Sequence, residues 1–299
     1  MKSVKFIIVL LIASQFMIGG CSSSKNQSAE SAPEMSSSSK GKYLLKLNPE
    51  EGKTGKMVMN INMDIAMEAM GQSLNTTQKM EMASDLKVLS NTDEKVVTSM
   101  KYDYITISMD IPMMGTMEYD TRKEDNEGMM ADAMGAAFGQ LIDNEITLEQ
   151  SHDGATLKTD GADGLAQMQS GQANMNISSM INMSQFPDKA IKIGESWNKK
   201  IEDAASPYTF DATYTLTKVE DGKVYIDLDS DVGMKEALAV EGEAVDTEMT
   251  GKQTGTFIYD QKTMWLIEAI LNQDFDMEVE QMGMSMPMKL KGDIIMVME

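Results

Sequence analysis

The feature that most constrains the fold is a near-strict alternation of apolar and polar residues over residues 57–69. The even positions are mostly polar, with Val58 and Ala66 as the exceptions. The odd positions are all apolar, namely Met57, Met59, Ile61, Met63, Ile65, Met67 and Ala69. A period of two sustained over this length indicates one long β-strand with an apolar face and a wet face. Such a strand needs other elements to cover its apolar face.

The pattern continues as an antiparallel meander. Apolar residues alternate through 80–88, a polar turn follows at 91–94, and alternation returns over 96–102. The apolar parity then shifts for residues 105–111, which predicts a β-bulge near Asp103. We therefore expect long strands joined by short turns in the first half of the chain.

The second half repeats this style and predicts a duplicated meander. The first meander is expected to end with a hairpin at 145–159, with its turn at Asp153-Gly154, and in the second half strands at 208–219 and 223–231 flank an acidic turn. Three more strands follow, the last one at 284–298. The segment Gly115–Asp120 (GTMEYD) parallels Gly255–Asp260 (GTFIYD), which favours a duplication of the whole unit.

One helix is expected within the first meander. Asn126 can cap a helix over about 127–143, in which apolar residues recur every four positions. The predicted fold class is α+β and predominantly β: a duplicated antiparallel meander of long curved, half-barrel-like strands with one main packed helix. The first meander is assigned to residues 43–185 and the second to 186–299.

The N-terminus carries the pattern of a lipoprotein signal peptide at residues 1–20. Lys2 and Lys5 precede a short apolar run, and Ile18-Gly19-Gly20-Cys21 resembles the lipobox. Cys21 is the only cysteine of the chain, and it becomes the lipidated first residue in this interpretation. Residues 21–42 form a serine-rich tether. The expected location is the cell envelope, lipid-anchored to the outer membrane and facing the periplasm.

Charge and motifs exclude several classes of function. The formal net charge is −21, so the surface repels phosphate backbones, and we expect no nucleic-acid partner. His152 is the only histidine, and the chain has no second histidine or further cysteine to complete a usual zinc site. No nucleophile elbow, phosphate loop or dinucleotide fingerprint is present. We expect no enzymatic activity and no cofactor.

Methionine is the unusual residue, with 32 copies in 299 residues. Unbranched thioethers fill irregular cores, they form adaptable apolar cavities, and they bind copper(I). The candidate apolar ligand face consists of Met57, Met59, Met63, Met67, Met130, Met134 and Phe138. The candidate copper site is the run of alternating methionines in the last strand, Met282, Met284, Met286 and Met288.

A motif between the halves carries a family resemblance. Residues 186–197 (FPDKAIKIGESW), with the lipobox and the later Gly-Thr-x-x-Tyr-Asp, resemble a group of uncharacterised Gram-negative envelope lipoproteins classed as a domain of unknown function. The resemblance implies a β-rich periplasmic fold and brings no catalytic residue with it. From its residues we interpret the motif as a structural segment that fastens the chain to the core, with Trp197 anchoring the following strand.

The sequence therefore predicts a non-catalytic envelope lipoprotein. Its partners are the membrane, through the lipid anchor, and an apolar or lipid-like molecule held on a methionine-rich concave face. Two alternatives stay open: a periplasmic copper(I)-binding protein, and a structural or interaction lipoprotein with a solid core.

Overall fold

The structure is a computed structural model, and it describes most of the chain beyond residue 40. The described residues are 41–69, 72–112, 115–124, 126, 134–135, 138–139, 141–142, 144–161, 186–202, 208–240, 243–281 and 284–299. The predicted signal peptide, the lipidated Cys21 and nearly all of the tether lie outside them.

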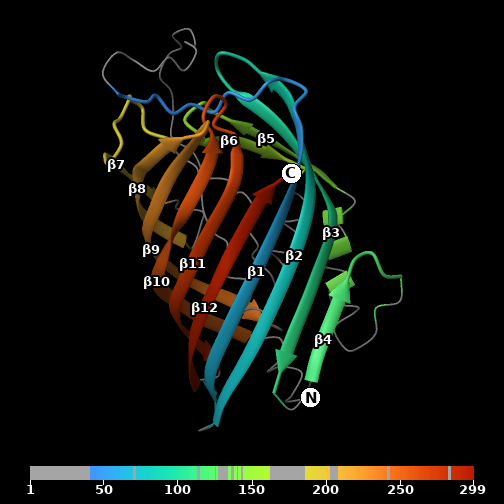
Figure 1. Ribbon diagram of the computed structural model, residues 1–299. Coiled ribbons are helices and arrows are strands. Elements are labelled where there is room, and N and C mark those ends of the chain that lie inside the picture. The colour runs from blue at the N-terminus through green and yellow to red at the C-terminus, as the bar shows by residue number, and fades with distance from the viewer. Residues whose placement is uncertain are drawn as a thin grey trace.

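The described residues form one antiparallel sheet of twelve strands (Figure 1). The strands are β1 (Thr54–Ala69), β2 (Gln72–Asn91), β3 (Val96–Ile111), β4 (Gly115–Asp120), β5 (Glu145–Gln150), β6 (Thr156–Asp160), β7 (Ser196–Glu202), β8 (Tyr208–Glu220), β9 (Lys223–Val240), β10 (Glu243–Asp260), β11 (Leu266–Gln281) and β12 (Met284–Met298). Their order is β6-β5-β3-β2-β1-β12-β11-β10-β9-β8-β7, and β4 also pairs with β3. The first and last long strands of the chain thus lie side by side in the middle of the sheet.

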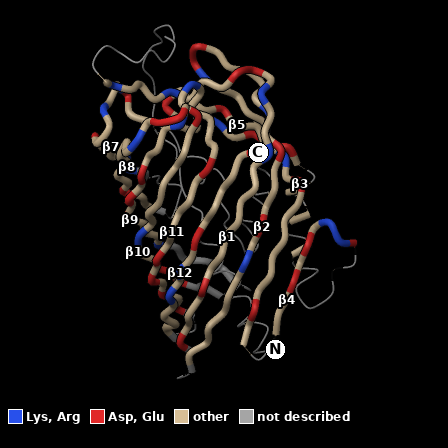
Figure 2. The backbone as a smooth tube through the Cα atoms, viewed as in Figure 1, with Lys and Arg blue, Asp and Glu red and all other residues tan. Residues whose placement is uncertain are grey.

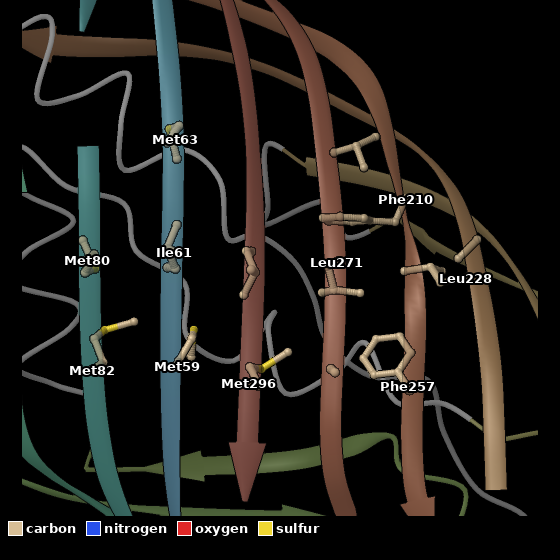
Figure 3. Packing of buried hydrophobic residues seen from close by; sticks show 14 of the residues in the cluster. Met59, Ile61, Met63, Met80, Met82, Phe210, Leu228, Phe257, Leu271 and Met296 are labelled. Atoms are coloured by element: carbon tan, nitrogen blue, oxygen red, sulfur yellow. The ribbon is translucent and has the colours of Figure 1, made fainter. Parts of the chain in front are cut away.

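The sheet curls so that one face is concave and apolar, as a half-barrel. Met59, Ile61 and Met63 on β1 point to the same side as Met80 and Met82 on β2 (Figure 3), and all five are at most 5% exposed. Charged residues are spread along the strands (Figure 2), at exposed positions that alternate with the buried ones and therefore lie on the convex face. Lysines there pair with acids across strands, as in Lys291–Asp274 at 2.8 Å. The predicted alternation between a buried and a wet face is confirmed.

The predicted strands and their irregularities are largely confirmed. Ala83 pairs with Tyr104 and Ser84 with Tyr102, so Asp103 is skipped at the predicted bulge. The turn between β8 and β9 consists of Asp221 (φ 52°) and Gly222 (φ 74°). Two successive residues with positive φ are those of the hairpin turn whose twist matches the flanking strands, which explains the Asp-Gly pair.

The predicted α+β class with a main packed helix is wrong. The described part of the chain is nearly all strand, and it contains no complete helix. Of the proposed helix at 127–143, only residues 134, 135, 138, 139, 141 and 142 are described. Among them Met134, Phe138 and Leu141 are buried against the sheet. The four-residue spacing thus predicted which of these side chains are buried, but the described structure is a β-sheet and not an α+β fold.

The two meanders merge into one sheet, because β1 pairs with β12 from Met57–Met298 to Met67–Met288. The two halves of the suggested repeat occupy different places in it. Gly115–Asp120 pairs with the end of β3, at residues 106–111. Gly255–Asp260 pairs instead with the beginning of β9, at residues 223–228. The shared GTxxYD letters therefore do not mark equivalent positions.

Candidate functional site

An apolar cavity lies inside the half-barrel at its upper end, which we define as the end with the turns after β2, β8 and β10. Its volume is about 130 Å³, and strands from both halves of the chain line it. The lining residues are Leu47, Met57, Met59, Leu86, Thr98, Met100, Tyr102, Leu148, Gln150, Gly154, Phe186, Phe257, Tyr259, Met264, Trp265, Leu266, Met296 and Met298. They include no histidine, cysteine, serine, carboxylate or basic residue.

Two irregular segments, residues 41–53 and 186–195, cross this end and close the cavity. The amide of Leu47 donates to the carbonyl of His152 at 2.8 Å, and the amide of Phe186 donates to the carbonyl of Asp153 at 2.7 Å. Tyr43 and Ile191 exchange two backbone hydrogen bonds, at 2.7 and 2.9 Å, which tie the two segments together. We call residues 41–53 and 186–195 the straps.

His152 has a structural place between these segments. Its Nδ1 lies 2.6 Å from the carbonyl oxygen of Leu47, and its Nε2 lies 2.8 Å from the carbonyl oxygen of Thr92. The ring thus joins the first strap to the turn after β2. Sequence reasoning gave this histidine no role, because its two partners lie 105 and 60 residues away along the chain.

The motif at 186–197 fastens its segment to the core, as its residues predicted. Phe186 enters the cavity wall and packs edge-on against Tyr259, with ring centroids 5.3 Å apart. The amide of Gly194 donates to the carbonyl of Leu216 at 2.7 Å, where Gly194 has a φ of 87°. Trp197 stacks on Tyr214 at 5.5 Å. Ile193 is 49% exposed, whereas Ile191 is buried, so these two isoleucines do not share a buried face.

Tyr259 and Asp260, at the end of β10, shape the part of the cavity wall that lies beside the turn after this strand. Tyr259 lines the cavity, and Asp260 holds the turn that follows β10. Its Oδ1 accepts hydrogen bonds from the Thr263 amide at 2.9 Å and the Thr263 hydroxyl at 2.7 Å. Partial burial acts to raise the pKa of Asp260, but hydrogen bonds from Thr263 and Lys262 outweigh it and lower the pKa. This turn presents Met264 and Trp265 to the cavity.

The cavity wall contains one notable polar atom. Trp265 is 7% exposed, and its indole nitrogen is buried without a hydrogen-bond partner among the described residues. A buried donor without a partner costs about 1–3 kcal/mol. Tyr102, Thr98 and Gln150 add further polar atoms, and burial raises the pKa of Tyr102 well above its usual value. The site can therefore offer hydrogen bonds within a mostly apolar enclosure.

The candidate apolar face predicted from sequence is only partly gathered at this cavity. Met57 and Met59 line it. Met63, Met67, Met134 and Phe138 are buried in the core but do not line the cavity. Met130 lies outside the described residues. Most of the other lining residues also lie on strands, but five come from the straps and turns, which have no period: Leu47, Gly154, Phe186, Met264 and Trp265.

The candidate copper run in the last strand is less complete. Met282 lies outside the described residues, and for Met284 only the backbone is described. Met286 and Met288 are 9% and 2% exposed and belong to the concave face. The described residues hold no group of three or more histidine, cysteine or acidic side chains placed to bind a metal. No helix in the described ranges has the length and apolar character to cross a bilayer.

Comparison with protein families gave one match. Residues 165–266 match the model of a family of unknown function, DUF6263. This range includes two of the three features that carried the resemblance, residues 186–197 and 255–260, and does not include the lipobox. The predicted resemblance to a family without known function is thereby confirmed for this part of the chain, and the lipoprotein assignment stays a prediction. A search of curated proteins found no match.

One of the solved structures found shares the fold at low sequence identity. A structure described as lipid–protein interactions in lipovitellin superimposes with a TM-score of 0.51 and 8% identity. The match covers 84% of this chain and 25% of the lipovitellin chain, so this chain spans about a quarter of that protein. An outer membrane channel from Pseudomonas putida F1 matches with 7% identity over 85% of this chain and 97% of its own. Its TM-score is only 0.26, and we draw nothing from it.

Proposed function

We propose that this chain is a non-catalytic envelope lipoprotein that holds an apolar, lipid-like molecule in the cavity at the upper end of its half-barrel. The observation that carries the proposal is the cavity of about 130 Å³, which the two straps cross and which is lined almost entirely by apolar side chains. Binding sites for small molecules have this composition, with a few placed polar groups. The lining offers no acid, base or nucleophile pair for catalysis.

The size of the cavity limits what it can hold. A cavity of about 150 Å³ lined by apolar residues stays dry and accepts a molecule as small as benzene. A whole drug-sized ligand needs about 300–1,000 Å³. The cavity therefore suits one short apolar group, such as the end of an acyl chain, with the rest of the ligand outside it.

The indole nitrogen of Trp265 adds a chemical preference. An acceptor oxygen on the ligand would satisfy this buried donor. The net charge of −21 opposes an anionic headgroup. We infer that the ligand carries an uncharged acceptor close to its apolar end, as an ester or amide does.

Two further points support the proposal. The lipovitellin structure that shares this fold is described in terms of lipid–protein interactions. The predicted lipid anchor at Cys21 would keep the domain beside a membrane, where molecules of this class are concentrated. We propose attachment to the outer membrane, with the folded part in the periplasm.

The test uses the full chain purified in detergent from its own envelope, followed by extraction and mass spectrometry of non-covalently bound lipids. Leu86→Trp places an indole in the cavity wall. Leu74→Trp is the matched control, because Leu74 is also a half-buried residue of β2 packed on the core but does not line the cavity.

We expect the wild type and Leu74→Trp to carry one lipid species in near-equal amounts, and Leu86→Trp to carry at least tenfold less. A wild-type protein that is free of lipid, or a Leu86→Trp variant that keeps its full load, would contradict the proposal. Either result would favour the structural or interaction role with a solid core.

A further inference from the structure

His152 sits where three elements meet at the upper end of the half-barrel. It belongs to the turn between β5 and β6, and its side chain is half-buried. Its Nδ1 lies 2.6 Å from the carbonyl oxygen of Leu47 on the first strap, and its Nε2 lies 2.8 Å from the carbonyl oxygen of Thr92 in the turn after β2. Both ring nitrogens therefore face hydrogen-bond acceptors.

Two acceptors fit only one protonation state of the ring. A neutral imidazole has one N–H, and its other nitrogen carries a lone pair, whereas the imidazolium has two N–H groups and can donate to both carbonyl oxygens. Distances of 2.6 and 2.8 Å are short for N–H···O hydrogen bonds, as expected when the donor is charged. In the neutral ring a lone pair faces a carbonyl oxygen across one of these distances, and that contact is repulsive.

The ring holds the part of the first strap that crosses the cavity. Leu47 lines the cavity, and its amide donates to the backbone carbonyl of His152 at 2.8 Å. Both backbone polar groups of Leu47 thus contact this one histidine. The next strap residue, Asn48, accepts a hydrogen bond at 2.8 Å from Asn91, beside the same turn that the ring contacts. Loss of a ring contact therefore loosens the strap directly above the cavity.

The other charged groups around the ring are carboxylates and lysines. Such groups ordinarily titrate below pH 5 or above pH 8, whereas histidine changes its charge between these values. Asp153, the next residue, accepts a hydrogen bond from the Ser151 hydroxyl and pairs with Lys199 at 3.9 Å. The remaining charged residues closest along the chain to Leu47, Thr92 and His152 are Lys46, Glu50, Asp93, Glu94, Lys95 and Glu149.

We propose that His152 is a proton-operated latch for the first strap. The protonated ring donates to both carbonyl oxygens and holds the strap across the cavity, and the neutral ring releases one of them, so that the strap opens. The state that binds the proton more tightly is favoured as the pH falls, so low pH closes the strap. The consequence for the ligand rests on the proposed function: the lipid-like molecule is retained at low pH and exchanges at higher pH.

Trp265 reports strap opening without any ligand. The chain has two tryptophans, and Trp197→Phe leaves Trp265, 7% exposed in the cavity wall, as the single one. Acrylamide quenching of its fluorescence is measured on the full chain in detergent from pH 5 to pH 8. In the same background, His152→Gln supplies a side chain that cannot change its charge, and Asp153→Asn is the matched control that keeps the histidine.

We expect the quenching constant to rise at least threefold between pH 5 and pH 8. This rise should persist in Asp153→Asn and be absent in His152→Gln. A quenching constant that does not depend on pH overturns the latch, as does a rise that survives His152→Gln or that disappears in Asp153→Asn.

The NMR signal of the imidazole provides a second measurement that does not depend on the folding of a variant. His152 is the only histidine of the chain, so its ring protons are assigned in the protein without any substitution at this position. Their titration should coincide with the rise in quenching. A titration at a different pH would overturn the latch.

The effect on ligand exchange is measured with a fluorescent fatty-acid methyl ester, an uncharged ester of the proposed class. Its release should be at least fivefold faster at pH 8 than at pH 5. Equal release rates would overturn the role of the latch in exchange. A protein that shows the rise in quenching but binds no ester would contradict the lipid function and leave the latch itself supported, so the two failures are distinguishable.

Discussion

Methionines line both ends of the half-barrel, but the two ends differ in what accompanies them. At the upper end, Phe186, Phe257, Tyr259 and Trp265 enclose the cavity together with six methionines, and backbone hydrogen bonds of the straps fix the wall from outside. At the lower end, five buried methionines are cross-strand partners in one row, which we call the methionine row: Met234, Met249, Met277, Met288 and Met67. Aromatic rings have few rotamers and hold one shape, whereas methionine adapts to many. The wall of the upper end is therefore more rigid than the methionine row.

The largest effect should come from removing an aromatic ring at the upper end. Phe257 is 1% exposed, and Phe257→Ala should lower the free energy of unfolding by about 3–5 kcal/mol, because it leaves a cavity that rings and straps cannot refill. Met249→Leu at the lower end should cost less than about 1.5 kcal/mol. Urea unfolding measures both. An equal decrease in the free energy of unfolding in the two variants would contradict the difference between the two ends.

Alkaline pH should weaken the fold through two tyrosines. Burial raises the pKa of Tyr102 and of Tyr214 in the folded chain well above the value of about 10 found in unfolded chains. The stabilisation is therefore complete below pH 10 and is lost as the pH rises from 10 toward the folded value. The ionisation of each tyrosine should lower the free energy of unfolding by about 1.4 kcal/mol for every pH unit above 10, up to its folded pKa.

Thermal melts at pH 9, 10 and 11 test this expectation. The Tyr102→Phe/Tyr214→Phe variant serves as the reference, because it lacks both hydroxyl groups. Its melting temperature should fall less between pH 10 and 11 than that of the wild type. Parallel pH profiles of the two proteins would show that other groups govern alkaline unfolding.

A smaller loss of stability is expected when the imidazole of His152, which joins the first strap to the turn after β2, is removed. His152→Ala removes a ring that lies between two carbonyl oxygens. A neutral imidazole can donate a hydrogen bond to one of them, and such a bond is worth about 1 kcal/mol. The amides of Leu47 and Asn48 should then exchange hydrogen faster, while those of β10 keep their protection. Leu89→Ala, at a side chain that is 42% exposed, is the control. Unchanged exchange at Leu47 would mean that the strap is held without the histidine.

The smallest effect on the fold should come from Cys21→Ser. A serine hydroxyl cannot form the thioether to diacylglycerol, so processing and lipid attachment should stop. The described domain begins some twenty residues later and should unfold at the same temperature as in the wild type. Metabolic labelling with palmitate and membrane fractionation measure the first effect. A labelled, membrane-bound variant would contradict the predicted anchor.

Much of the sheet could be predicted from sequence because a half-buried strand repeats every two residues. Met57–Ala69 and the bulge at Asp103 are examples, since each inward side chain is apolar for the same physical reason. The predicted main packed helix is not found in the described part of the chain, although Met134 and Phe138, four residues apart, are buried there as their spacing predicted. Periodicity reports burial more directly than it reports fold class.

The candidate site was harder to predict, because its walls come from segments that are distant in sequence. Met57 and Met59 were found by strand parity, whereas Leu47 and Trp265 belong to a strap and a turn without a period. The methionine row was hidden for a different reason. Its members are spread from Met67 to Met288, and only the register of five strands shows that they are neighbours.

The placement of β1 beside β12 has a consequence for how the chain folds. Met57 pairs with Met298, so the middle of the sheet cannot close until almost the last residue of the chain is available. Contacts this distant in sequence slow folding and leave apolar strand edges exposed in the meantime. If the chain is exported as its N-terminus predicts, it crosses the membrane with the strand at 54–69 still lacking its final partner. Such a chain would depend on holding chaperones until translocation of residues 284–298 is complete.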